Sequence, residues 1–293
     1  MQKIMILLRI IICFSILLMK QSFANSDGKV TYFPLRIHYN AEECYIDSEN
    51  RIMQSFYINK AANEKWYSFD TSNRERQIIK IVKNNAVLKV MEYTGENSIG
   101  HLDAFYVDDN VVWATDKYTQ PSIVKLMDGL IIKRFQYPFH VVSNQVLAVN
   151  RYSSNEFILW AGDKPKEKTI FLGRFNTAKT KIAFLTKTSI NFPQEITLQG
   201  LAYNGIRLYA LTGEANKEMR LYIWNMSMRK LERVYSLIFD SKAQRYDYLE
   251  PEGLQVSKFY NKESLYIGYV IRRKVNGGNQ FLNCIANFNT NNL

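Results

Sequence analysis

A repeat of about fifty residues runs through this chain and constrains its fold more than any other feature. Each unit opens with a polar residue, continues through an alternating apolar stretch and a polar turn, and reaches a second apolar stretch with an aromatic residue. The openers are Gln54, His101, Gln145, Gln199 and Glu252, separated by 47, 44, 54 and 53 residues. Each unit therefore predicts a β-hairpin, followed by enough chain for two more strands.

Units of this length match a four-stranded propeller blade. Short alternating runs of Tyr, Phe, Val and Ile, with almost no amphipathic helical stretch, predict an all-β chain. Four-stranded blades pack radially into a ring, so five units predict a five-bladed β-propeller. Six blades are the alternative, less favoured because residues 25–53 hold only one or two strands. A pair of β-sandwiches or an irregular β-solenoid would also accommodate the strands.

The first 24 residues have the features of a cleavable secretory signal peptide. They are two positive residues, an apolar run and a small-residue cleavage site: Lys3 and Arg9, Ile10–Met19, and Ser22–Ala24. The apolar run is too short to span about 30 Å of hydrocarbon as a helix, and no later stretch is long enough either. We therefore expect cleavage before Asn25, one domain over residues 25–293 without a transmembrane segment, and a secreted or periplasmic protein.

The chain is basic. Loss of Lys3, Arg9 and Lys20 with the signal peptide would lower the net charge from +11 to +8. This charge favours an anionic partner such as a cell-envelope glycan or polymer, through long-range attraction that salt weakens. Because Lys and Arg are scattered, solubility alone is an equally good explanation, and we expect no nucleic-acid partner. We expect a monomer.

Cys44 and Cys284 remain after cleavage and lie near opposite ends of the mature chain. Export to an oxidising compartment makes them a candidate disulfide. If residues Val30–Arg36 complete the last blade beside the C-terminal strands, the two cysteines become neighbours and the disulfide closes the ring. Two buried free thiols are the alternative.

The first strand of each propeller blade lines the central channel, so the polar openers should converge at the channel mouth. The candidate ligand-binding residues are Gln54, His101, Asp103, Gln199, Glu250 and Glu252. Buried amides and carboxylates without partners cost several kcal/mol each, so the pattern predicts a ligand, a cation or ordered water. Hydrogen bonding to the backbone of the neighbouring blade is the alternative. Calcium would be the metal, since it prefers oxygen ligands; we expect no other cofactor.

Common enzyme motifs are absent from the sequence, including Gly-x-Ser-x-Gly, His-Glu-x-x-His, the Walker loop and the dinucleotide fingerprint. His101 is the best single candidate for general acid–base chemistry, because the pKa of histidine lies near neutrality. A binding protein is favoured over an enzyme. Tyr246–Tyr248 and Arg272–Lys274 are candidate surface contacts for sugar polymers or acidic head groups, and a solvated basic turn is the favoured interpretation of Arg272–Lys274. Trp66, Trp113 and Trp160 are expected in the core.

Several short segments resemble the repeats of helveticin J-like class III bacteriocins and the related phage baseplate propellers. They are Gln54–Phe56, Gly100–His101, Gln199–Gly200, Leu208–Gly213, Glu250–Leu254 and Leu265–Gly268. The resemblance implies a propeller that engages bacterial surfaces and, in the bacteriocin branch, kills or inhibits competing cells. Glu250–Gly253 also resembles esterase-like phytase propellers. That likeness implies, as an alternative, a secreted phosphatase or esterase that uses Glu252, His101 and calcium. A structural or secretion-associated partner is a third hypothesis.

Overall fold

The computed structural model describes residues 31–71, 76–100, 102, 105–108, 111–116, 122–136, 146–151, 156–162, 169–176, 183–189, 197–228, 230–240, 246–260 and 262–293. The expected signal peptide lies outside these residues, as do His101, Asp103 and Gln145. The described part is all-β apart from the short 3-10 helices η1 (Ala41–Glu43), η2 (Gly95–Asn97) and η4 (Thr290–Asn292). Within it, no helix has the length and apolar character needed to cross a membrane.

Twenty strands form five sheets among these residues. The first sheet contains β2 (Met53–Asn59), β3 (Glu64–Asp70), β4 (Gln77–Lys83) and β5 (Ala86–Tyr93). The second contains β6 (Phe105–Asp108), β7 (Val111–Asp116), β8 (Ser122–Met127) and β9 (Leu130–Gln136). The third contains β10 (Val146–Arg151), β11 (Glu156–Gly162), β12 (Thr169–Asn176) and β13 (Ala183–Ser189).

The fourth sheet contains β14 (Leu198–Tyr203), β15 (Arg207–Thr212), β16 (Arg220–Asn225) and β17 (Lys230–Phe239), with β1 (Tyr32–Ile37) added at its edge. The last sheet has three longer strands, β18 (Tyr248–Phe259), β19 (Lys262–Val275) and β20 (Gly278–Asn289). Consecutive strands within every sheet pair antiparallel, and all five predicted opening hairpins are present.

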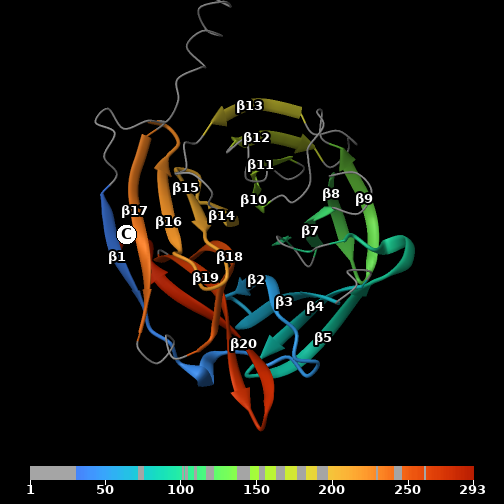
Figure 1. Ribbon diagram of the computed structural model, residues 1–293. Coiled ribbons are helices and arrows are strands. Elements are labelled where there is room, and N and C mark those ends of the chain that lie inside the picture. The colour runs from blue at the N-terminus through green and yellow to red at the C-terminus, as the bar shows by residue number, and fades with distance from the viewer. Residues whose placement is uncertain are drawn as a thin grey trace, which may run out of the picture.

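The sheets are arranged around a common centre, as in a propeller (Figure 1). Their first strands contact one another in chain order, β2 with β6, β6 with β10, β10 with β14 and β14 with β18. Strand β18 also contacts β2, which closes the ring. We call β2, β6, β10, β14 and β18 the inner strands.

The prediction of five equal four-stranded blades is corrected by this topology. Four sheets have the four consecutive strands of a blade, whereas the last sheet has three. A six-bladed ring is not formed by the described residues. The last unit is long enough for four short strands, but it forms three strands of 12 to 14 residues. The number of strands could therefore not be predicted from its length.

The prediction that the N-terminal strand completes the last blade is also wrong. Strand β1 pairs in parallel with β17 of the fourth sheet, with Ile37 opposite Phe239, and does not join the last sheet. The outer edge of β17 offers an apolar surface on which Ile37 becomes buried. The chain after β1 reaches the last sheet instead, where Tyr45 forms an antiparallel bridge with Asn283 of β20. The ring is therefore closed by residues that follow the expected segment.

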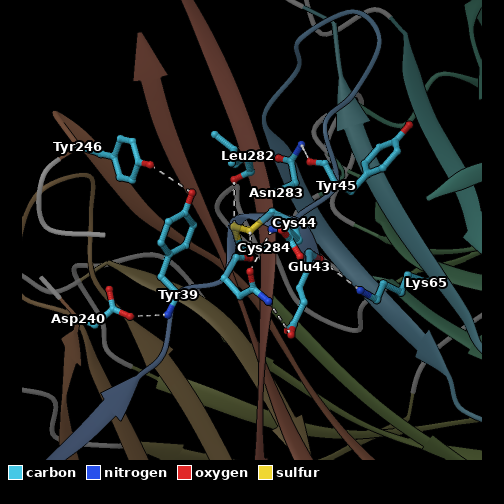
Figure 2. The surroundings of a disulfide bond; sticks show 12 residues. Tyr39, Glu43, Cys44, Tyr45, Lys65, Asp240, Tyr246, Leu282, Asn283 and Cys284 are labelled. Carbon is cyan, nitrogen blue, oxygen red and sulfur yellow. Dashed lines mark hydrogen bonds between the residues drawn. A yellow bond between two sulfur atoms is a disulfide. The ribbon is translucent and has the colours of Figure 1, made fainter. Parts of the chain in front are cut away.

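A disulfide joins Cys44 to Cys284 beside this bridge, across 240 positions of sequence (Figure 2). Its surroundings are tied together by further contacts. The Tyr39 backbone N–H donates to Asp240 Oδ2 at 2.9 Å, and the hydroxyls of Tyr39 and Tyr246 lie 3.3 Å apart (Figure 2). Of the two alternatives for these cysteines, the structure contains the disulfide.

Buried ion pairs attach the segment after the disulfide, residues 47–51, to strand β4 of the first sheet. Asp47 is only 2 % exposed, and it accepts hydrogen bonds from Arg51 Nε at 2.8 Å and Lys80 Nζ at 2.6 Å. Burial raises the pKa of the Asp47 carboxyl, but the hydrogen bonds from Arg51 and Lys80 outweigh it and hold the pKa below its usual value. Asp47 is thus a structural carboxylate with two cationic partners.

The core lies between neighbouring sheets. Trp66 of β3 and Trp113 of β7 are buried, as expected, and Tyr209 of β15 and Tyr266 of β19 occupy the matching second strands. Trp160 lies in β11, but its side chain is outside the described part. The repeat in the sequence therefore marks a repeated core position in the second strand.

Candidate ligand-binding site at the centre of the ring

Three of the five polar openers occupy β-bulges in inner strands. The extra residues are Gln54 in β2, Gln199 in β14, and Glu252 with Gly253 in β18. A bulge leaves its extra residue out of the ladder and redirects the side chain, and bulges are common beside functional sites. The polar residue that opens each of these units is therefore the residue released from strand pairing.

Glycines bring these bulges close to one another. A Cβ atom on Gly200 would lie 2.7 Å from the Leu254 Cβ atom, so β14 and β18 approach at their bulges. Gly253 has a φ of +90°, and a Cβ atom there would lie 3.3 Å from Ser55 Oγ, beside the bulge of β2. Both positions favour glycine. Gln199, Glu252 and Gln54 consequently follow one another on adjacent inner strands.

Glu252 is the most buried of these residues, at 7 % exposure. Within the described part of the chain, its carboxyl group makes no hydrogen bond. Burial raises the pKa of Glu252 well above its usual value, and the nearby carboxylates of Glu250 and Asp70 raise it further. The side chain therefore stays protonated to a higher pH than an exposed glutamate does.

The neighbouring carboxylates have partners of their own. Glu250 accepts a hydrogen bond from the hydroxyl of Tyr248, and burial followed by this carboxylate raises the pKa of Tyr248. Asp70, at the end of β3, accepts from the backbone N–H of Leu102 at 3.2 Å. The carboxylates that raise the pKa of Glu252 thus come from the first and last sheets.

Of the two glutamines, Gln54 donates from Nε2 to the Ile52 carbonyl at 3.4 Å. The side chain of Gln199 makes no hydrogen bond to any described residue. Both are half-buried. We define the hub cluster as Gln54, Asp70, Gln199, Glu250 and Glu252.

A residue that the sequence analysis missed bonds one inner strand to the next. Gln255 Oε1 accepts from the backbone N–H of Ile58 at 2.6 Å, and its Nε2 donates to the carbonyl of the same residue at 3.2 Å. Gln255 thus bonds the backbone of the neighbouring sheet, the role that the sequence analysis gave as the alternative to ligand binding for the polar openers. The available signal was the position of Gln255, three residues after Glu252.

The predicted surface contacts are partly engaged with each other. The Asp247 carboxylate accepts from Arg272 Nε at 3.2 Å and Nη2 at 3.0 Å. The same guanidinium lies 5.3 Å from the centre of the Tyr248 ring. Tyr246 lines a cleft of about 480 Å³ between the fourth and last sheets.

The described residues contain no group of three or more His, Cys, Asp or Glu side chains placed to hold a metal ion. Asp70, Glu250 and Glu252 do not form such a group. Calcium therefore stays a prediction from the sequence.

No protein-family model matches the sequence, and no curated protein is significantly similar to it. A solved structure does match: the tail fiber of Staphylococcus aureus phage P68, with a TM-score of 0.60 and 16 % sequence identity over 85 % of this chain and 52 % of the fiber. The two proteins share a fold. The chain spans about half the length of the fiber. The designed protein Ika4, with a TM-score of 0.35, 13 % identity and coverage of 63 % of this chain and 97 % of Ika4, is too different to support any argument.

The fold likeness agrees with the phage half of the sequence resemblance. The two proteins have a propeller-like arrangement of sheets in common. Nothing in the comparisons bears on the resemblance to helveticin J-like bacteriocins.

Proposed function

We propose that this protein is exported and binds a bacterial cell-envelope polymer through the hub cluster. The observation that carries the proposal is the coincidence of the polar openers with β-bulges on adjacent inner strands. Apolar side chains would serve better if these positions only packed, because unpaired polar groups are costly to bury. The likeness to a phage tail fiber supports a role in binding.

The charge of the chain supports an anionic polymer. A net charge of +11 before cleavage raises the local concentration of polyanions such as teichoic acid or lipopolysaccharide around the protein. This attraction acts at long range and weakens as salt shortens the Debye length. Capture by the basic surface and recognition at the hub would then be separate steps.

Co-sedimentation with purified envelopes tests the proposal. The mature protein is incubated with envelopes from several Gram-positive and Gram-negative bacteria at low and at physiological salt. We expect binding to at least one envelope, and weaker binding by Q199A and E252Q than by the surface variant E42Q. Absence of binding to every envelope at low salt would overturn the proposal.

Antibacterial activity is the finer form of the same proposal, suggested by the helveticin-like segments. Growth and viability of the bacteria that bind the protein would be followed after its addition. A loss of viability that E252Q fails to produce would place the protein in the bacteriocin branch. Binding without loss of viability would leave it as an envelope-binding protein.

A secreted hydrolase is the second candidate, and the raised pKa of Glu252 is the observation that favours it. A carboxylic acid whose pKa is raised by burial can act as a general acid. A screen with generic phosphate and ester substrates separates the two candidates. Turnover that E252Q abolishes supports the hydrolase, whereas the binding proposal expects none.

A further inference from the structure

The hub cluster carries negative charge in a chain that is otherwise basic. The charged groups of the described residues that act on Glu252 are two other carboxylates, Glu250 and Asp70. Arg272, the cation beside Tyr248, is paired with Asp247. Among the described residues, the charged groups of the hub cluster are therefore opposite in sign to the net charge of the chain.

Asp47 is a buried carboxylate with a structural role, and it can be compared with Glu252. It is 2 % exposed and accepts hydrogen bonds from two cations, at 2.8 Å from Arg51 Nε and 2.6 Å from Lys80 Nζ. Glu252 is similarly buried, at 7 % exposure, but makes no hydrogen bond and has no cation among the described residues. A buried carboxylate without a partner is unfavourable, so Glu252 keeps its proton until a ligand supplies a cation.

An organic cation fits better than a metal. The described residues offer no group of three acidic, histidine or cysteine side chains placed around a metal ion. A primary ammonium has three N–H donors and needs acceptors on one side only. Glu252 and Glu250, with the amide oxygens of Gln54 and Gln199 on the neighbouring strands, provide acceptors of this kind.

We propose that the hub cluster binds a primary ammonium group carried by an envelope polymer with an anionic backbone, the chemistry of a D-alanylated teichoic acid. This inference rests on the proposed function and specifies its ligand. The basic surface attracts the polyanionic backbone, and Glu252 forms a charge-assisted hydrogen bond with the ammonium substituent.

The inference has a pH signature. Glu252 must lose its proton to pair with a cation, and its pKa is raised by burial, by Glu250 and by Asp70. Among the described residues, Tyr248 also interacts with Glu250 and Glu252, and its own raised pKa keeps it neutral. Binding of the ammonium group should therefore release a proton and strengthen as pH rises.

Calorimetric titration with a matched pair of polymers tests the inference. One polymer is teichoic acid with its D-alanyl esters, and the other is the same material after mild alkaline removal of the esters. At low salt and pH 7.5, we expect the unmodified protein to bind the esterified form about tenfold more tightly, the gain typical of one charge-assisted hydrogen bond. E252Q should lose this preference and still bind the backbone, whereas E42Q, which replaces an exposed glutamate outside the hub cluster, should keep it.

Proton release provides a readout that needs no variant. Titrations in two buffers of different ionisation enthalpy should show a proton released on binding the esterified polymer and none with the hydrolysed polymer. Equal affinity for both polymers without proton release would overturn the inference and leave the proposed function intact. Binding to neither polymer would also overturn it, and the whole-envelope assay would then show whether the proposed function fails as well.

Discussion

Asn283 Oδ1 accepts a hydrogen bond of 2.8 Å from the backbone N–H of Met53, the residue directly before the bulge at Gln54. The same buried amide donates to the carbonyls of Tyr45 and Arg51, both at 3.2 Å. One side chain of β20 therefore links the N-terminal segment to the first inner strand. Ring closure and the position of the hub cluster are coupled through it.

Replacing Asn283 with Leu should destabilise the protein by about 2–4 kcal/mol, because the Met53 N–H and the Arg51 carbonyl lose their partner and the Tyr45 carbonyl keeps only the backbone N–H of residue 283. Urea unfolding of the purified variant measures this. Asn291→Ala, at an exposed position of η4, is the control and should change stability by less than about 0.5 kcal/mol. Equal stability of the two variants would contradict the stabilising role of the Asn283 hydrogen bonds.

Removing the disulfide should cost about 2–5 kcal/mol, because the bond restricts a loop of 240 residues in the unfolded chain. The double variant Cys44→Ala, Cys284→Ala should unfold at a lower urea concentration than the parent. A reducing agent should shift the parent toward the variant and leave the variant unchanged. Two free thiols titrated in the non-reduced parent would rule out the bond.

Asp47→Asn should destabilise the fold by about 3–5 kcal/mol, because Lys80 then loses its buried carboxylate partner and Arg51 keeps only the exposed carboxylate of Glu49. The parent should also lose this stabilisation as pH falls below the usual range for aspartate, since the pKa of Asp47 is lowered in the folded state. Asp128→Asn, in an exposed pair with Lys89, is the control, with an expected change below about 1 kcal/mol. Thermal unfolding at pH 7 and pH 3 compares the variants.

Gly268→Ala should cost about 1–3 kcal/mol through overpacking. A Cβ atom on Gly268 would lie 2.7 Å from the Phe56 ring and would also meet the backbone carbonyl of Glu252. Gly278→Ala is a matched control, since the nearest atom to its Cβ would be the Val275 carbonyl oxygen at an ordinary 3.6 Å. If both variants unfold at the same urea concentration, the close packing behind the bulge is refuted.

Glu252 makes stability depend on pH in the direction opposite to Asp47. Its pKa is raised in the folded state, so its contribution is fully present below the usual pKa of glutamate and is lost as pH rises toward the folded value. E252Q does not ionise, so its stability relative to the parent should grow by about 1.4 kcal/mol per pH unit within that range. Urea titrations of E252Q and the parent between pH 4 and pH 8 measure the slope, with E42Q, at an exposed position, as the control variant. A constant difference between E252Q and the parent would mean that the carboxyl ionises freely.

The sequence predicted the elements that have local signals. The five hairpins follow from alternating apolar runs around polar turns, and the matching buried aromatics follow from the repeat. The openers Gln54, Gln199 and Glu252 stood out because a polar residue recurred just before each apolar run. Their location in bulges explains why they are polar and also why they recur.

The partners of distant segments had no such signal. The alternation in Tyr32–Ile37 indicates a strand but does not say which strand edge it joins, and the edge of β17 was not foreseen. Gln255 and Asn283 bond to backbone groups 197 and 230 residues away, and backbone groups carry no sequence code. These contacts depend on how the ring closes, which only the assembled fold determines.

The most direct test of the central claim is a crystal structure of the protein with a bound fragment of an envelope polymer. We predict density for the fragment at the centre of the ring, in contact with Gln54, Gln199 and Glu252. Density confined to the cleft at Tyr246, or to the outer surface of the sheets, would contradict the assignment of the hub cluster as the binding site.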